Sequence, residues 1–313
     1  MRHKNHLIGD FAGHTYAWAS IGLAVAVCLF IIGNVAYLGA DIISLEFLTQ
    51  PPPANTRITT EGGILTPMIG TIILTLLGIL IALPISLSTA LYLTWYTKKG
   101  IIKTIIESSV DVLAGVPTVV IGLFAQAVFT QPWLGFLSTR IHIEGGLGKA
   151  FGRSFFVAGI AMAIMILPFI TKAIIESIKT TPKEFPEGSF ALGATKWRTV
   201  TKIVLNSARP GIVTGVVLGM GRIISDTAIV WLALGGSLRM PGAQPWYEPQ
   251  NWISTLQHTG STLTTYIFFT SPAGEGSNPI LAFGAAFVLI VIIIVLNAAV
   301  AAIGLIGANK VQK

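Results

Sequence analysis

The sequence predicts an all-α integral membrane protein that crosses the bilayer six times. Of its 313 residues, 53% are hydrophobic and only 11% are charged, whereas a soluble domain carries about 25% charged residues. The apolar residues form continuous runs that are long enough for transmembrane helices and lack the alternation of a barrel strand. The basic residues gather between these runs, as they do in the cytoplasmic loops of membrane proteins.

The six expected helices lie at residues 15–38, 68–95, 110–130, 155–175, 212–234 and 280–306. Pro84, Pro117 and Pro168 lie within three of them, where each removes a backbone hydrogen bond and kinks its helix. The first run exceeds the apolar core of a signal peptide, about 7–15 residues, and is interpreted as a retained span. Residues 1–61 form this span with an external proline-rich loop, and residues 62–313 form the transmembrane core.

The Lys and Arg residues predict the side of the membrane on which each loop lies. With six spans, both termini lie on one side. If that side is the cytoplasm, the outer loops hold five of the 20 basic residues, namely Arg57, Arg140, Lys149, Arg153 and Arg239. Arg222 falls within a span, and the other 14 lie in inner segments. This asymmetry predicts a multi-pass protein of the plasma or inner membrane with both termini cytoplasmic.

The most polar internal segment is the basic loop at residues 180–211, between the fourth and fifth spans. Pro182 and Pro186 suit the start of a short helix, and Gly193 permits a sharp turn after it. Thr195 is a candidate N-cap for a second helix that leads back to the membrane. The loop is large enough to contact a soluble partner.

This loop resembles the EAA loop of ABC importer permeases, whose pattern is E-A-A-x3-G-x9-I-x-L-P. It reads E-G-S at 187–189, G at 193 and I-V-L-N at 203–206, so Gly-Ser replaces Ala-Ala and Asn replaces the final Pro. The resemblance implies the type I ABC importer permease fold, with a cytoplasmic coupling helix that fits a cleft on an ATPase dimer. The residues that it assigns to coupling are Glu187, Gly188, Ser189, Ala191, Leu192 and Gly193.

Two charged residues, Arg222 and Asp226, lie inside the fifth expected span. Because they are four residues apart, they are expected to share one face of a helix. Charges at membrane depth usually face a cavity, a partner charge or a water path. The pair either neutralises itself and orients packing, or it holds a guanidinium fork ready for the oxygens of an anion.

Two segments resemble the phosphate permeases of ABC importers, nearer to the PstA type than to the PstC type. Residues 222–228 read R-I-I-S-D-T-A against R-x-x-G-E-T-A, and residues 113–118 read L-A-G-V-P-T against L-A-G-V-P-S. The resemblance implies a path for inorganic phosphate lined by Arg222, Asp226, Thr227 and Thr118. It also implies a second permease of the PstC type and an extracytoplasmic phosphate-binding protein as partners.

Other functions are weighed against this one. A permease for another oxyanion or small solute, such as molybdate, sulfate or an amino acid, is the first alternative, and a membrane enzyme or scaffold without transport is the second. The five histidines have no metal-ligand spacing. The glycine-rich stretch at 145–150 departs from a phosphate-binding loop. We therefore expect a transport subunit that is not an enzyme and has no cofactor of its own, with ATP and Mg²⁺ on the partner ATPase.

Overall fold

The computed structural model describes residues 2–53, 62–98, 100–141, 149–236 and 246–309, and it confirms the all-α membrane fold. Four helices are long and apolar enough to cross a bilayer: α1 (Arg2–Gly39), α3 (Leu65–Leu91), α6 (Phe155–Lys179) and α13 (Pro279–Asn309). Two bent helix pairs bring the crossings in this described part to as many as six. Each crossing is helical because only a helix satisfies its own backbone hydrogen bonds in lipid.

The expectation of a single helix for the third span is wrong. Two helices replace it, α4 (Ile101–Ala114) and α5 (Thr118–Phe129), and their axes differ by 103°. The break falls at Pro117, which has no backbone NH and disfavours helical backbone in the residue before it. Thr118 thereby becomes the first residue of a new helix.

The fifth span is also divided. An arm made of α8 (Lys196–Thr199), the π-helical turn η4 (Val200–Val204) and α9 (Leu205–Ser207) meets α10 (Arg209–Ser225) at a 65° bend. After α10 ends, a short helical segment at residues 228–234 begins and includes the π-helical turn η5 (Val230–Leu234). The sequence predicted an uninterrupted span from 212 to 234, so this boundary is corrected.

Helix α6 lies at the centre of the larger apolar core, and α3, α5 and α10 pack around it. Gly211, Gly215 and Gly219 of α10 are spaced four residues apart, a pattern that allows two helices to approach closely. A Cβ on Gly211 would overlap Ser177 of α6, and one on Gly215 would lie 3.2 Å from the Cβ of Ala173. The repeat therefore packs α10 against α6 within this chain.

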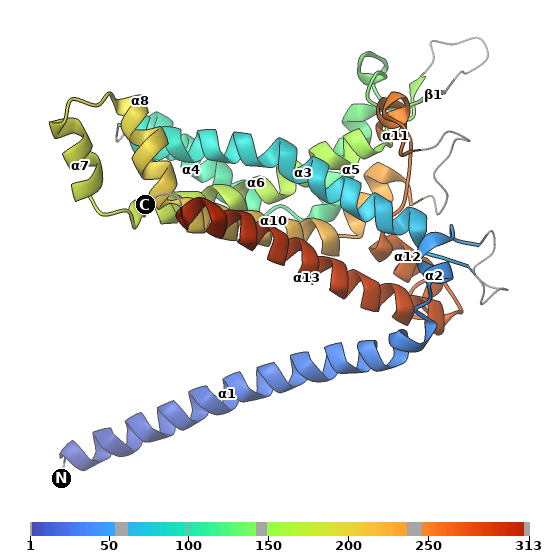
Figure 1. Ribbon diagram of the computed structural model, residues 1–313, viewed down its shortest axis with the longest axis horizontal. Helices are drawn as coiled ribbons and strands as arrows, with labels where there is room; N and C mark the ends of the chain where they lie inside the picture. The colour runs from blue at the N-terminus through green and yellow to red at the C-terminus, as the bar shows by residue number, and fades with distance from the viewer. Residues whose placement is uncertain (1, 54–61, 99, 142–148, 237–245, 310–313) are drawn as a thin grey trace.

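The two ends of the molecule carry different elements (Figure 1). At one end, α7 (Glu184–Ala191) and α8 lie near the last residues of α13, and the first residues of α1 point to the same side of the molecule but lie well apart from them. The other end carries the short helices α2, α11 and α12 and an antiparallel strand pair. Their bounds are Leu45–Thr49 for α2, Trp252–Gln257 for α11, Leu263–Thr270 for α12, Arg140–Ile141 for β1 and Lys149–Ala150 for β2. Both chain ends thus share the end that carries the 180–211 loop, while its cytoplasmic orientation stays a prediction.

Helix α1 diverges from the other helices towards its N-terminal end (Figure 1). It meets α13 near Gly39, where an added Cβ would press on the backbone of Phe283. The remaining short turns are η1 (Ala40–Ile42), η2 (Tyr92–Tyr96), η3 (Pro132–Leu134) and η6 (Pro249–Asn251). Arg57, Arg239 and the glycine-rich stretch at 145–148 lie outside the described residues.

Candidate functional site

A break in the fifth span sets the geometry of the candidate substrate path. Helix α10 ends at Ser225, and Asp226 takes an extended conformation with φ −78° and ψ 126°. The Asp226 carboxylate accepts a hydrogen bond from the backbone NH of Ile229 at 2.7 Å, as an N-cap aspartate does. Asp226 therefore caps the segment 228–234, and this preference of aspartate for N-caps is the local reason for a break without proline.

The Arg222 side chain lies over an aromatic ring rather than against Asp226. Its guanidinium carbon is 3.9 Å from the ring centroid of Phe169 on α6, which is cation–π geometry. The expectation that Arg222 and Asp226 share one helix face is wrong, because α10 ends between them. The two charges interact through space, but no described carboxylate forms an ion pair with Arg222.

Thr118 joins this site from α5. It is the first residue of α5, directly after Pro117, and its side chain lies close to the Asp226 carboxylate. Thr227 follows Asp226 and is half-buried. The structure thus brings Thr118, Asp226 and Thr227 together at the break, while Arg222 lies one helical turn earlier.

Arg222 is partly exposed on the surface of this chain, although α10 belongs to a membrane-crossing pair. A charged side chain at such a place faces a water path or a partner, because exposure to lipid is costly. Phe169 covers one face of the guanidinium plane. The N–H donors lie at the edge of that plane and point away from the ring. Such donors suit an oxyanion.

The 180–211 loop folds into two short helices at an angle to each other, as the sequence predicts. Gly193 adopts φ +77° shortly after α7, a backbone region that favours glycine. The Thr195 side chain accepts a hydrogen bond from the backbone NH of Arg198 at 3.4 Å and so caps α8. The turn between the two helices is therefore set by Gly193, and the start of α8 by Thr195.

The predicted coupling residues differ in exposure. Glu187, Gly188, Ala191, Leu192 and Gly193 are exposed, and Leu192 is 91% exposed. Ser189 is instead buried, and its hydroxyl lies 2.9 Å from that of Thr199 on α8. Ser189 therefore holds α7 against α8 and is not presented to a partner.

Exposed apolar side chains surround this helix pair. Phe185 and Phe190 lie on α7, and Trp197 on α8 is 65% exposed. The arm is joined to the membrane helices by Lys196, whose ammonium nitrogen lies 4.7 Å from the ring centroid of Tyr96. An exposed apolar tip on an anchored arm is suited to insertion into a groove of another protein.

Three side chains that make contacts between helices were not predicted from the sequence. The Phe169 ring contacts the Arg222 guanidinium, and Lys172 of α6 forms an ion pair with Asp111 of α4 at 2.6 Å. In the sequence, Lys172 is one of the charges that set the topology, and Asp111 marks a membrane edge. Nothing in local spacing connects α4 with α6, so the signal available was the rarity of charges near apolar spans.

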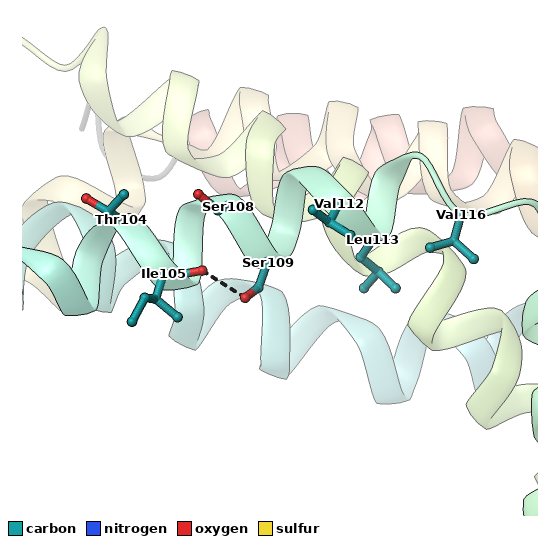
Figure 2. A pocket seen from close by; sticks show the side chains of 7 residues that line it. All are labelled: Thr104, Ile105, Ser108, Ser109, Val112, Leu113 and Val116. Carbon is teal, nitrogen blue, oxygen red and sulfur yellow. Dashed lines mark hydrogen bonds between the residues drawn. The ribbon is translucent and has the colours of Figure 1, made fainter.

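A groove of about 500 Å³ runs along the outer side of α4 (Figure 2). It ends at Val116, two residues before Thr118, and its lining combines apolar side chains with three hydroxyl groups. The hydroxyls belong to Thr104, Ser108 and Ser109, and that of Ser109 donates to the Ile105 carbonyl at 2.8 Å. The groove therefore follows one face of α4, and its lining holds no residue of the break site.

Residues 82–306 match the family described as binding-protein-dependent transport system inner membrane component. The match includes α4 to α12, with the helix pair α7 and α8 and the break at Asp226. The chain belongs to this family. It is therefore the permease subunit of an ABC importer, a membrane transport subunit whose family works with a separate binding protein.

Relatives within this permease family include chains of both named phosphate types. The chain is 31% identical to the phosphate transport system permease protein PstC of Xylella fastidiosa over 72% of its own length and 70% of the relative's. It is 28% identical to the phosphate transport system permease protein PstA 1 of Mycobacterium tuberculosis over 80% and 73% of the two chains. These similar identities leave the nearness to the PstA type a prediction.

Solved permeases support the fold. An inward-facing MetNI methionine ABC transporter chain superposes with a TM-score of 0.51 at 16% identity, covering 76% of this chain and 91% of that chain. A bacterial ABC transporter involved in alginate import gives a TM-score of 0.52 at 18% identity, covering 76% of this chain and 77% of that chain. At such identities the likeness concerns the type I importer fold alone.

Proposed function

We propose that this permease forms the translocation path of an ATP-driven importer of inorganic phosphate. The observation that carries the proposal is the match to phosphate permeases of two named types over most of this chain. The break site supports it, because a guanidinium with no ion-pair partner among the described residues lies one helical turn before the break at Asp226, where Thr118 and Thr227 also lie.

Within this proposal, Arg222 is the principal anion contact. Its donors match the geometry of phosphate oxygens, and Phe169 fixes the orientation of the plane. Thr118 and Thr227 offer hydroxyl groups at the break, and the Asp226 carboxylate accepts a hydrogen bond from a protonated phosphate oxygen. The same carboxylate repels a fully ionised anion and so prevents tight retention, which a transport site must avoid.

Coupling runs through the helix pair α7 and α8, which leads into the arm of α8, η4 and α9. The exposed residues near Gly193 enter a cleft on a dimeric ATPase, and ATP-driven closure of that dimer moves the arm. The arm continues into α10 through the 65° bend, so its motion reaches Arg222. The protein thus alternates between inward-open and outward-open states whose populations the ATPase shifts.

The proposal includes three partners and an orientation. An ATPase dimer that holds ATP and Mg²⁺ binds the exposed coupling surface in the cytoplasm, where both termini also lie. A second phosphate permease, of the PstC type, completes the path on the side to which Arg222 is exposed. An extracytoplasmic phosphate-binding protein docks at the end that carries α11 and α12.

The test is uptake of radiolabelled phosphate by vesicles that contain the reconstituted complex. ATP-dependent uptake that unlabelled phosphate suppresses, and that sulfate and molybdate do not, is the expected result. Suppression by sulfate or molybdate alone would assign another oxyanion. Arg222→Gln should abolish uptake without loss of the ATPase from the purified complex, while Arg209→Gln at the other end of α10 is the matched control.

A further inference from the structure

The ion pair between Lys172 and Asp111 links α6 with α4, the first half of a bent pair that is apolar enough to cross a membrane. Lys172 lies seven residues before the end of α6, which is about 10 Å along the helix. Its ammonium nitrogen is 2.6 Å from the Asp111 carboxylate on α4. The two side chains are 50% and 64% exposed, so the pair lies on a surface of the chain and not in its core.

Lys172 and Phe169 lie three residues apart on α6 and hence share a helix face. Since the Phe169 ring contacts the Arg222 guanidinium, Lys172 lies about one helical turn along α6 from the residue that holds Arg222. Each cation has one carboxylate near it from a different element, Asp226 for Arg222 and Asp111 for Lys172. The two positive groups are therefore placed to hold one multiply charged anion in succession.

The rest of α4 is largely exposed and presents both apolar and hydroxyl side chains. Within α4, Val110 alone is buried. Ser108 lies one turn before Asp111, and both Ser108 and Thr104 line the groove that leads to Val116 (Figure 2). Hydroxyl groups thus continue along α4 from the level of Asp111 towards its N-terminal end.

We propose that Lys172 is a second oxyanion contact on the inner part of the path, and that Asp111 competes with the anion for it. This proposal rests on the proposed phosphate function. An anion leaving Arg222 displaces the Asp111 carboxylate from Lys172, and the returning carboxylate then releases the anion. A site with a built-in competitor binds weakly enough to let its ligand leave.

The competing explanation is a structural ion pair that only neutralises two charges between α4 and α6. In such a pair, removal of either charge should lower uptake equally, because it leaves the other charge unpaired. Uptake should also recover when both charges are removed together. An anion contact requires Lys172 whether or not Asp111 is present.

The test uses the reconstituted complex and radiolabelled inorganic phosphate. We expect Lys172→Gln to lower initial uptake about tenfold or more, the loss typical of one charged hydrogen bond. The double variant Lys172→Gln/Asp111→Asn should be equally impaired. Asp111→Asn alone should make uptake more sensitive, by about tenfold, to unlabelled phosphate on the ATPase side, because the competitor is gone.

Lys179→Gln is the matched control, since Lys179 also lies on α6 and pairs with a carboxylate, that of Glu176, at 2.8 Å. It should leave uptake unchanged, and Lys172→Arg should retain most of it. Recovery of uptake in the double variant, or equal losses of uptake in both single variants, would overturn the proposal and show that the ion pair is only structural. Absence of phosphate uptake by the unmodified complex would instead contradict the phosphate function itself.

Discussion

The guanidinium carbon of Arg222 lies 3.9 Å from the ring centroid of Phe169, so this cation–π contact joins α10 to α6. The chain is tightly packed just before this point, where a Cβ added at Gly219 of α10 would lie 3.1 Å from the Ile170 side chain of α6. The close approach of the two helices thus brings the ring within reach of the charge.

Loss of the Phe169 ring should weaken transport without unfolding the protein. A cation–π contact contributes about 0.5–2 kcal/mol, so Phe169→Leu should reduce kcat/KM for phosphate uptake by roughly 2- to 30-fold. Phe169→Tyr keeps an aromatic face and should retain uptake near that of the unmodified protein. Equal uptake by the Leu and Tyr variants would show that the ring does not position Arg222.

Asp226 has two roles that can be separated by substitution. Asparagine caps a helix about as well as aspartate does, so Asp226→Asn should keep the bond to the Ile229 NH and the thermal stability. Asp226→Ala should lose this hydrogen bond and lower the free energy of unfolding by about 1 kcal/mol. Unfolding curves of the detergent-purified complex measure this difference.

Uptake by the same variants tests the charge. We expect Asp226→Asn to alter the phosphate dependence of transport, because the carboxylate beside Arg222 is removed. Unchanged uptake by the Asp226→Asn variant would show that Asp226 acts only as a helix cap.

The spans and the coupling arm could be predicted from the sequence, because both depend on local signals. Continuous apolar runs, the glycine at 193 and the threonine at 195 each determine structure within a few residues. The glycine repeat of α10 predicted a close helix contact, but the identity of the partner helix required the tertiary structure.

Two features of the site were beyond local reasoning. Pro117 indicated a kink, yet the 103° angle depends on how α4 and α5 pack on other helices. Asp226 was interpreted as a helix-face partner of Arg222, although its N-cap preference was also present in the sequence. Tertiary contacts, such as that between Arg222 and Phe169, join residues that no spacing rule relates.

Helix contact between α10 and α6 gives a stability prediction. A Cβ on Gly211 would overlap the Ser177 side chain and lie 3.2 Å from the Ala173 carbonyl oxygen. Gly211→Ala should therefore lower the free energy of unfolding by about 1–3 kcal/mol, as overpacking does. Gly221→Ala is the control, because nothing lies within 4 Å of its Cβ position, and it should unfold at or above the midpoint of the unmodified protein.

The turn at Gly193 gives a prediction about coupling. An L-residue at φ +77° is strained by roughly 1–2 kcal/mol, and a Cβ there would touch nothing within 4 Å. Gly193→Ala should therefore act through backbone strain alone, changing the angle between α7 and α8. We expect the complex to assemble more weakly and phosphate uptake per ATP hydrolysed to fall.

Gly22→Ala supplies the control for this test. Gly22 lies within α1, away from the coupling surface, with open space at its Cβ position, and alanine stabilises a helix interior relative to glycine by about 0.5–1 kcal/mol. This variant should couple normally, whereas Glu187→Lys should lower the amount of ATPase that co-purifies, because it reverses an exposed charge on the coupling surface. Normal ATPase binding and stimulation in both Gly193→Ala and Glu187→Lys would contradict the assignment of this arm to coupling.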